Sequence, residues 1–298
     1  MDWPTGFKRN VEGAFPQGEE WLRSLPQLLR EFEHRWKIAL GPPFELSFNY
    51  VAPAVEASGN SVVLKAGVPT TALISEIQAL RLYDGDAAVR LLEFDTEKGV
   101  LLMERLIPGR SLETFSDATN DEEATRIAAR VMRQLWRPLP PDHSFTTVEQ
   151  WASGLKRLRQ RFAGETGPFP KRLVEMAESH FDELLSSSSS PVLLHGDLHH
   201  LNILKSQDTW KAIDPKGVAG EPSYEVCALM LNPISRHSND GRIQRRRLEV
   251  LTEELGLDSK RMLGYAIAHS VLSAWWSFED SAADWESALA CAQTLEGL

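Results

Sequence analysis

Three polar side chains in the middle of the chain have the types and the spacing that phosphoryl transfer requires. Asp197 lies two positions after His195, which follows the apolar run at residues 192–194. Asn202 comes five positions after Asp197, and a later apolar run ends at Asp214. The last phosphoryl group of a nucleotide needs Mg²⁺ to neutralise its oxygens and a carboxylate to orient the attacking hydroxyl. The sequence therefore predicts a phosphoryl-transfer centre here.

Each of these side chains has a chemical reason for its place. Mg²⁺ prefers oxygen ligands in near-octahedral geometry, and Asn202 and Asp214 can supply them from the two ends of a hairpin. Asp197 then serves as the catalytic carboxylate that accepts a hydrogen bond from the hydroxyl. The order H-x-D-x-x-x-x-N, followed by an Asp at a strand end, is also that of kinases. A surface turn rich in His, Asp and Asn is the alternative, and the flanking apolar runs disfavour it.

The histidines of this segment have several roles open to them. We favour a structural role for His195, whose ring would hold the loop by hydrogen-bonding to backbone, because Asp197 is better placed as the base. Direct proton transfer by His195 is the alternative. His199 and His200 could form a zinc site with His195, but no neighbouring cysteine and no matching carboxylate spacing supports one.

A second set of residues upstream suits nucleotide binding. Lys65 ends a predicted strand and Glu76 lies on the next predicted helix. A kinase uses a lysine on the α- and β-phosphates and a helix glutamate that holds the lysine. Two ordinary surface charges are the alternative reading of this pair. Backbone groups of Met103, Glu104 and Leu106, where two lobes would join, are expected to hydrogen-bond adenine, and a plain edge strand is the alternative.

The first third of the chain predicts a small, sheet-rich lobe. Short β-branched runs around a Ser-Gly-Asn turn are typical of a hairpin. Thr70 or Thr71 can cap a helix that places Leu73, Ile77 and Leu80 on one face. Strands are predicted at residues 36–40, 47–51, 61–65, 88–94 and 99–104.

Helices dominate after Pro108-Gly109, so we place a lobe boundary near Arg105. Thr119 with Glu122 fits a capping box at the start of the first of these helices. Further helices are predicted at residues 147–162, 171–185, 244–255, 259–278 and 281–295, and strands at 191–194, 202–205 and 210–213. The prediction is an α+β, two-lobed, protein-kinase-like fold with an antiparallel-sheet N-lobe (1–105) and a larger helical C-lobe (106–298).

Composition narrows the classes of partner. The 298 residues carry a formal net charge of -10, which disfavours a nucleic-acid partner and allows attraction of a cationic ligand. The two cysteines cannot build a disulfide framework. The sequence shows neither a signal peptide nor an apolar stretch near the ~18 residues of a membrane span, so the cytoplasm is the expected location.

The string at residues 195–204 resembles the catalytic motif of aminoglycoside phosphotransferases. More narrowly, the chain resembles the aminoglycoside/hydroxyurea antibiotic-resistance kinases, the streptomycin 6-phosphotransferase group. The resemblance runs from about Trp21 to Asn232. It is carried by the segments 83–92, 101–112 and 195–222, the last of which includes Ile213-Asp214-Pro215-Lys216-Gly217.

This resemblance implies ATP- and Mg²⁺-dependent phosphorylation of a hydroxyl on a small molecule. It implies that Asp197 is the catalytic Asp, that Asn202 and Asp214 are the metal ligands, and that Lys65 binds phosphate. The middle of the loop departs from the common form, so His200 is expected to change the loop conformation. No G-x-G-x-x-G precedes Ser47, and the phosphate-covering loop is placed at residues 41–46.

The acceptor pocket is expected to lie after Asp214, with Glu221 and Glu225 as weak candidates for substrate contact. Carboxylates mixed with indoles would suit a polycationic sugar or a guanidinium group. For Trp275 and Trp276 a place in the core is the stronger interpretation. The residues concerned near the C-terminus are Trp275, Trp276, Glu279, Asp280, Asp284 and Trp285.

Four functions are weighed on these residues. The leading one is an aminoglycoside-type O-phosphotransferase, with streptomycin as one acceptor. The nearest alternative is a housekeeping small-molecule kinase acting on a sugar, an amino alcohol or a hydroxyurea-like compound. A catalytically inactive kinase-like module is disfavoured because all five site residues are intact: Lys65, Glu76, Asp197, Asn202 and Asp214. A protein kinase is disfavoured because the sequence has no Asp-Phe-Gly and no Ala-Pro-Glu. The sequence leaves oligomeric state and the choice between ATP and GTP open.

Overall fold

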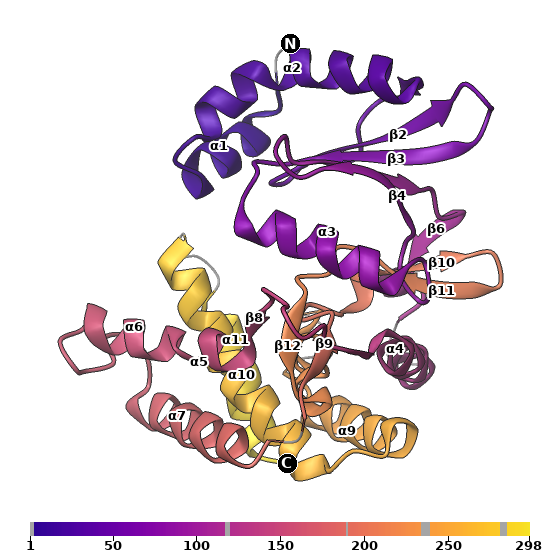
Figure 1. Ribbon diagram of the computed structural model, residues 1–298. Coiled ribbons are helices and arrows are strands. Elements are labelled where there is room, and N and C mark those ends of the chain that lie inside the picture. Colours follow the sequence, from indigo (N-terminus) through magenta and orange to yellow (C-terminus); the bar gives the residue numbers. More distant parts are fainter. Residues whose placement is uncertain (1–2, 117–119, 189, 234–238, 281–284) are drawn as a thin grey trace. The chain divides into compact units, whose positions relative to one another are not determined.

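The computed structural model describes residues 3–116, 120–188, 190–233, 239–280 and 285–298. The chain forms two compact units, Met1–Gly109 and Arg110–Leu298 (Figure 1). The lobe boundary predicted near Arg105 lies a few residues before this division. We describe each unit by itself and call them the N-terminal unit and the C-terminal unit.

The N-terminal unit is built on a five-stranded antiparallel sheet, which confirms the predicted sheet-rich lobe. The strand order is β1-β2-β3-β5-β4. Its strands are β1 (Ile38–Leu40), β2 (Tyr50–Glu56), β3 (Ser61–Ala66), β4 (Leu91–Asp95) and β5 (Val100–Glu104). In the central pair β3–β5, Lys65 lies opposite Leu101.

The two faces of this sheet are covered by different helices. Helices α1 (Thr5–Ala14) and α2 (Gly18–Trp36) share a buried core with Leu64 and Ala66 of β3. Because side chains alternate along a strand, Lys65 points to the opposite face. Helix α3 (Thr71–Tyr83) lies on that face, and Figure 1 shows α2 and α3 on opposite sides of the sheet.

Helix α3 begins as its sequence predicts. The Thr70 side chain accepts a hydrogen bond from the Leu73 amide at 3.3 Å, and Leu73, Ile77 and Leu80 are buried. An N-cap of this kind satisfies one of the unpaired amides at a helix start. The capped, apolar-striped helix therefore holds a fixed position on the sheet, and with it Glu76.

The N-terminal segment corrects two of the predictions. Helices α1 and α2 occupy residues 5–14 and 18–36, which the sequence analysis did not assign, and Trp36 ends α2 instead of starting a strand. The signal was present, because the buried residues of α2 recur at helical spacing. The strand predicted at 47–51 begins only at Tyr50, since residues 47–49 form bends.

The C-terminal unit is mainly helical and is organised around one long helix. Helix α10 packs against α11, α7, α8, α6 and α9, and twelve of its residues are buried. The helices are α4 (Asp121–Leu135), α5 (Val148–Ala152), α6 (Gly154–Arg161), α7 (Lys171–Ser186), α8 (Cys227–Leu231), α9 (Gly241–Leu255), α10 (Ser259–Asp280) and α11 (Trp285–Glu296).

The single helix predicted over 147–162 is wrong in one respect, because it is divided into α5 and α6. The division falls at Ser153, and Gly154 begins α6. A Cβ atom on Gly154 would lie 2.7 Å from the Cδ1 of Leu272, so α10 passes close to this position. Thr119 of the predicted capping box and residues 281–284 of the last predicted helix lie outside the described residues.

Two small sheets carry the loop of interest. One has the order β7-β9-β12-β8, with β7 (Arg137–Pro138), β8 (Thr146–Thr147), β9 (Val192–Leu194) and β12 (Val218–Gly220). The other has the order β11-β10-β6, with β6 (Pro108–Ser111), β10 (Ile203–Ser206) and β11 (Thr209–Ala212). Short 3-10 turns lie at Leu112–Thr114, His200–Asn202 and Pro222–Tyr224.

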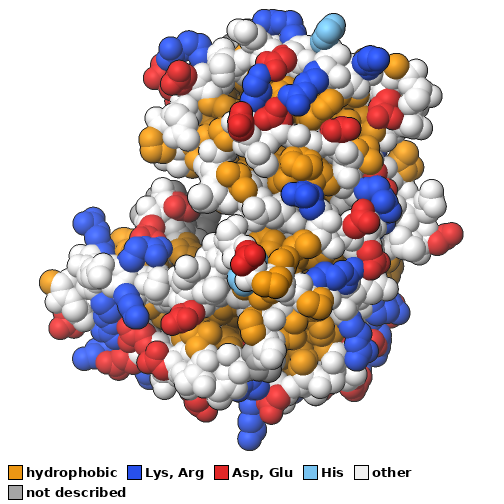
Figure 2. Space-filling view, viewed as in Figure 1, with side chains coloured by type: hydrophobic (Ala, Val, Ile, Leu, Met, Phe, Trp, Pro, Cys, Tyr) orange, Lys and Arg blue, Asp and Glu red, His pale blue; other side chains and the backbone are white. Residues whose placement is uncertain are grey.

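The surface charge is mixed. Figure 2 shows basic and acidic side chains interspersed over the visible face of the described residues, although the chain as a whole carries a net charge of -10. Within the described part of the chain, no helix combines the length and the apolar character needed to cross a membrane.

A buried ion pair ties two helices of the C-terminal unit together. Arg247 of α9 is 1% exposed, and its guanidinium donates to both oxygens of Asp121 in α4 at 2.9 and 2.6 Å. It also donates to the carbonyl oxygens of Leu229 and Asn232 at 3.0 and 2.8 Å. One side chain thus fixes α4, α9 and the end of α8.

We predict that Arg247→Met destabilises the protein strongly. Removing one partner of a buried pair costs about 3–5 kcal/mol, because the other charge is left without compensation. Urea unfolding followed by circular dichroism measures this. Arg246→Met is the matched control, since Arg246 pairs with Glu122 on the half-exposed side of the same helices and should change stability far less. Equal losses in the two variants would contradict the prediction.

Candidate active site

Strand β9 leads directly into the candidate catalytic loop, which we define as residues 195–202. Gly196 has a φ of +81°, and a Cβ atom there would lie 2.6 Å from the Cγ2 of Val218 in β12. Glycine is therefore required both by the backbone conformation and by the space available. The sharp turn it allows carries the chain from β9 to Asp197.

His195 braces this loop through its ring. The ring is fully buried, and its Nε2 donates to the carbonyl oxygen of Ile213 at 2.8 Å. Its Nδ1 accepts the Asp197 amide hydrogen at 3.2 Å. Burial lowers the pKa of His195 to about 4, so the ring is neutral at physiological pH, as this hydrogen-bonding pattern requires. The ring occupies the loop-bracing position that the sequence analysis favoured.

Glu225 fixes the same turn by hydrogen bonds to its backbone. Its carboxylate is buried and accepts the amide hydrogens of His195 at 2.7 Å and of Gly196 at 2.9 Å. Burial raises the pKa of Glu225 to about 7, and its two amide donors oppose that rise. Both carboxylate oxygens therefore have partners within the loop, and substrate contact by Glu225 stays a prediction to which this geometry adds no support.

Asp197 is held on its backbone while its carboxylate stays accessible. The Asn202 side-chain amide donates to the Asp197 carbonyl at 2.9 Å. The carboxylate lies 3.2 Å from Nζ of Lys216 and 3.7 Å from Nε2 of His199, and the side chain is 33% exposed. Asp197 is thus a fixed carboxylate beside one lysine, with an open side for a hydroxyl.

Asn202 and Asp214 lie at the two ends of the β10–β11 hairpin, as predicted. The amide of Ile213 donates to the Asn202 carbonyl at 2.9 Å, which brings the two ends together. The Nδ2 of Asn202 is committed to Asp197, so Oδ1 is the side-chain atom suited to a cation. Asp214 adds a carboxylate from a left-handed backbone position with a φ of 59°. Oxygen donors of these types are the ligands that Mg²⁺ prefers, and metal binding by the two residues stays a prediction.

His199 lies between these groups. Burial lowers its pKa, whereas the carboxylates of Asp197 and Asp214 oppose that effect. His200 is buried within the 3-10 turn, and the expected effect of this residue on the loop conformation stays a prediction. Among the residues that the structure describes, no group of three or more His, Cys, Asp and Glu side chains is arranged to hold a metal ion. The zinc alternative therefore has no ligand set there.

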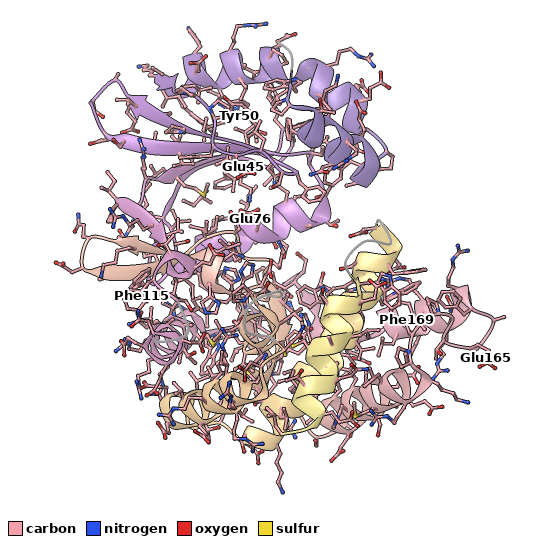
Figure 3. All side chains as sticks on the ribbon, turned by 180° about the vertical axis from the view of Figure 1, so that it is seen from behind. Glu45, Tyr50, Glu76, Phe115, Glu165 and Phe169 are labelled. Atoms are coloured by element: carbon pink, nitrogen blue, oxygen red, sulfur yellow. The ribbon has the colours of Figure 1, made fainter. Side chains whose placement is uncertain are left out.

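The N-terminal unit brings Lys65 and Glu76 into one ion pair. Nζ of Lys65 lies 2.7 and 2.8 Å from the two carboxylate oxygens of Glu76, and the residues are only 3% and 7% exposed. Glu76 lies on α3 (Figure 3). A buried, bidentate pair differs from the two independent surface charges that were the alternative interpretation, and it fixes the lysine head group on the α3 face of the sheet.

The other nucleotide-site predictions lie on the same unit. Met103 and Glu104 end β5, and Leu106 follows it. The Glu104 amide donates to the Arg90 carbonyl at 3.0 Å and is already used within the unit. Residues 41–46 form the irregular connection between β1 and β2. Adenine binding and phosphate covering by these segments stay predictions.

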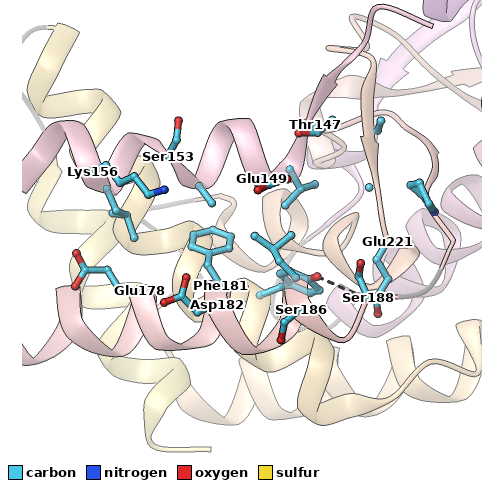
Figure 4. Close-up of a pocket in the computed structure, with 18 of the residues that line it drawn as sticks. Thr147, Glu149, Ser153, Lys156, Glu178, Phe181, Asp182, Ser186, Ser188 and Glu221 are labelled. Carbon is cyan, nitrogen blue, oxygen red and sulfur yellow. Dashed lines mark hydrogen bonds between the residues drawn. The ribbon is translucent and has the colours of Figure 1, made fainter. Parts of the chain in front are cut away.

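Glu221 belongs to a pocket of about 720 Å³ within the C-terminal unit (Figure 4). Its carboxylate forms a bidentate ion pair with Arg261 at 2.7 and 2.6 Å. The pocket lies at the Gly220 end of β12, whereas the catalytic loop follows Leu194, which pairs with Val218 at the other end. Contact of Glu221 with a substrate at Asp197 stays a prediction.

The C-terminal aromatic residues divide into two groups. Trp275 is buried, and Phe169 (Figure 3) packs against Trp275 and Trp285 with ring centroids 6.0 and 4.8 Å apart, so these belong to a core cluster. Trp276 is only partly buried and faces a different neighbour, Trp151. Glu279 is paired with Arg157, burial raises the pKa of Asp280, and Asp284 lies outside the described residues.

Sequence reasoning did not single out Lys216 or His199 for the catalytic centre. Lys216 reaches Asp197 because its amide and that of Gly217 both approach the His195 carbonyl, at 2.8 and 3.3 Å. The only sequence signal was the position of Lys216, two residues after Asp214. This pairing is a tertiary contact that spacing along the chain does not predict.

We predict that Glu225→Gln removes a specific pH dependence of stability. In the folded protein the Glu225 pKa is about 7, above its ordinary value of 4.5. The folded state therefore retains a proton that the unfolded chain releases, and this contribution to stability is present below about pH 4.5 and is lost as the pH rises through about 7. The Tm of Glu225→Gln should lie below that of wild type at low pH, and this difference should shrink by several degrees as the pH rises from about 4.5 to about 7.

Thermal unfolding across a pH series measures this difference. Glu149→Gln, at an exposed glutamate of α5, is the control and should give a curve parallel to wild type. A Glu225→Gln curve that is also parallel to wild type would show that the carboxyl does not titrate in this window.

The chain is similar to one family of kinases and to individual members of it. The family model described as aminoglycoside/hydroxyurea antibiotic resistance kinase matches residues 41–281. The streptomycin 6-kinase of Streptomyces glaucescens is 30% identical over 100% of this chain and 98% of its own length. The hydroxyurea phosphotransferase of Kitasatospora aureofaciens is 31% identical over 88% of this chain and 76% of its own length.

A solved structure agrees on the fold. An aminoglycoside phosphotransferase in a ternary complex with ADP and hygromycin B superposes with a TM-score of 0.62, covering 91% of this chain and 98% of its own, at 13% identity. This likeness confirms the two-lobed, kinase-like fold class. From the family match and the full-length relatives, the chain belongs to the aminoglycoside/hydroxyurea antibiotic resistance kinase family and is a phosphotransferase.

Proposed function

We propose that this protein transfers the terminal phosphoryl group of ATP, with Mg²⁺, to a hydroxyl of a streptomycin-like aminoglycoside. The observation that carries the proposal is the environment of Asp197. Its backbone amide donates to His195 and its backbone carbonyl accepts from Asn202, while its carboxylate is one-third exposed beside Lys216. Family membership supports the reaction class, and the relatives named streptomycin 6-kinase support the acceptor.

In this mechanism the Asp197 carboxylate accepts a hydrogen bond from the acceptor hydroxyl and takes its proton as the oxygen attacks the terminal phosphorus of ATP. The bond from that phosphorus to the bridging oxygen breaks, and ADP leaves. Lys216 pairs with this carboxylate at 3.2 Å. Asn202 and Asp214 would hold Mg²⁺, which when bound neutralises charge on the phosphate oxygens. His195 holds the Asp197 amide throughout, so that the carboxylate stays aimed.

The N-terminal unit supplies the nucleotide contacts of the proposal. Lys65 binds the α- and β-phosphates of ATP, and Glu76 holds its head group in place. Backbone groups around Met103, Glu104 and Leu106 contact the adenine. Replacing ATP by GTP in the assay tests the choice of nucleotide.

A neutral acceptor is the second candidate. The relative named hydroxyurea phosphotransferase, at 31% identity, favours it, because hydroxyurea carries no positive charge. Mg²⁺-dependent ADP release with streptomycin, with hydroxyurea and with uncharged sugars separates the two candidates. Release with streptomycin above the other acceptors is expected. Nucleotide binding without turnover on any acceptor would instead favour the inactive kinase-like module.

We predict that Asp197→Asn lowers kcat for phosphoryl transfer by about 10²–10⁴-fold, the usual contribution of a positioned general base. The isosteric amide keeps the size of the side chain, so the melting temperature should stay near that of wild type. Asp208→Asn, at an exposed position in the turn between β10 and β11, is the matched control and should retain activity. Normal turnover in Asp197→Asn would remove Asp197 from the proposed chemistry.

We predict that Glu76→Gln lowers kcat/KM for ATP by about tenfold or more, because Lys65 loses the charged partner that positions it. Steady-state kinetics at saturating acceptor measures this change. Glu56→Gln, at the end of β2 and away from α3, is the control. An unchanged kcat/KM for ATP would contradict a phosphate-binding role for the Lys65–Glu76 pair.

A further inference from the structure

Two half-buried indoles meet within the C-terminal unit. Trp151 of α5 and Trp276 of α10 are arranged edge to face, with ring centroids 5.4 Å apart and planes at 81°. Neither ring belongs to the core cluster around Trp275 and Phe169. Half-buried aromatic rings in contact present both apolar faces and polar edges to whatever binds beside them. We call Trp151 and Trp276 the indole pair.

The indole pair lies against the catalytic loop. A Cβ atom on Gly196 would be 3.1 Å from Cη2 of Trp151, so the six-membered ring of this indole packs on the backbone of Gly196. Gly196 directly precedes Asp197. The indole pair is therefore adjacent to the residue that is proposed to receive the hydroxyl.

Two rings that pack against the indole pair, those of His269 and Tyr224, are fixed in orientation. His269 of α10 lies 5.9 Å from Trp276 in a T-shaped arrangement, and its Nδ1 is 2.7 Å from Oη of Tyr224. Tyr224 in turn lies 6.1 Å from Trp151. Burial lowers the pKa of His269 to about 4, so this ring adds no positive charge near the indoles at neutral pH.

The position of Trp276 is constrained from the α6 side as well. A Cβ atom on Gly154 would lie 3.2 Å from Nε1 of Trp276. The glycine that begins α6 therefore leaves room for the indole. Both rings of the pair are held by neighbouring elements before any ligand arrives, which reduces the entropy cost of binding.

We propose that the indole pair is the acceptor-specificity element of the active site and binds the planar cationic group of the acceptor while Asp197 receives its hydroxyl. This inference rests on the proposed function. Indole faces attract guanidinium and ammonium groups through the ring quadrupole, most strongly when the site is partly desolvated. Streptomycin carries two guanidinium groups on the ring that bears hydroxyls, whereas hydroxyurea has no cation for the indoles to select.

Two carboxylates near the indole pair are each paired with a basic side chain. The Asp197 carboxylate lies next to Gly196, and Glu279 follows Trp276 by about one turn of α10, where it is paired with Arg157. Asp197 is paired with Lys216 as well, so the local charge is balanced and preference for a cation rests on the indole faces. An uncharged acceptor gains from the pair only apolar contact, so removal of the indoles should affect the two kinds of acceptor differently.

The experiment measures equilibrium binding of streptomycin by calorimetry, and kcat and KM for streptomycin and hydroxyurea, on the full chain. The variants are Trp151→Leu, Trp276→Leu and the conservative Trp151→Phe and Trp276→Phe. Each Leu variant should raise Kd and KM for streptomycin about tenfold, with kcat changed less than about threefold. The Phe variants should recover most of the affinity, and KM for hydroxyurea should stay near wild type.

Trp210→Leu is the matched control, because it removes a partly buried indole from β11 that packs on Phe115 and Lys205 instead. The inference is overturned if the Leu variants bind streptomycin like wild type, if they raise KM equally for both acceptors, or if Trp210→Leu has the same effect. If a melting curve shows that a Leu variant does not fold, the Phe variants take its place. The inference is overturned if a Phe variant raises the Kd for streptomycin by a smaller factor than it raises the KM for hydroxyurea.

The two proposals fail differently in this experiment. A wild-type protein that binds streptomycin through the indole pair but releases no ADP overturns the proposed function and supports the inference. A wild-type protein that phosphorylates streptomycin without any contribution from the indoles overturns the inference alone. A wild-type protein that does not bind streptomycin overturns both.

Discussion

The structure around the active site depends on one buried carboxylate. Glu225 accepts the amide hydrogens of His195 and Gly196, two consecutive donors at a turn that has no regular strand partner for both. Without these acceptors, two buried amides would remain unpaired, which is a costly arrangement in a protein interior. The turn between β9 and the catalytic loop is therefore fixed by a side chain that follows it by about thirty residues.

Two buried, neutral histidine rings lie near this turn. The buried rings of His195 and His269 have pKa values near 4, so burial keeps them uncharged and available as hydrogen-bonding and packing groups. The charge of Asp197 is met instead by Lys216, whose amide is anchored to the His195 carbonyl. A carboxylate held by its backbone can remain accessible, because its position does not depend on burying its charged oxygens.

In the N-terminal unit, a buried ion pair holds the lysine side chain in position. Lys65 and Glu76 are both buried, and each needs the other because an isolated charge in that environment is unfavourable. Strand alternation turns Lys65 toward α3, and the Thr70 cap with the apolar stripe of α3 fixes the register of Glu76. The pair therefore depends on the strand and the helix together.

The sequence by itself determined the segments and the residue types of this active site. The apolar run before His195, the spacing from Asp197 to Asn202 and the following strand that ends at Asp214 are local patterns, and local patterns are readable because their periods are those of strands and helices. The N-terminal helices α1 and α2 had such a pattern too and were simply overlooked.

Only the tertiary structure decided which distant residues serve that segment. Glu225 accepts loop amides, Lys216 pairs with Asp197, and Trp151 meets Trp276. Each of these contacts joins elements that are separate in the chain, so their spacing in the sequence carries no record of them. Packing in three dimensions, under the requirement that buried polar groups find partners, selects them.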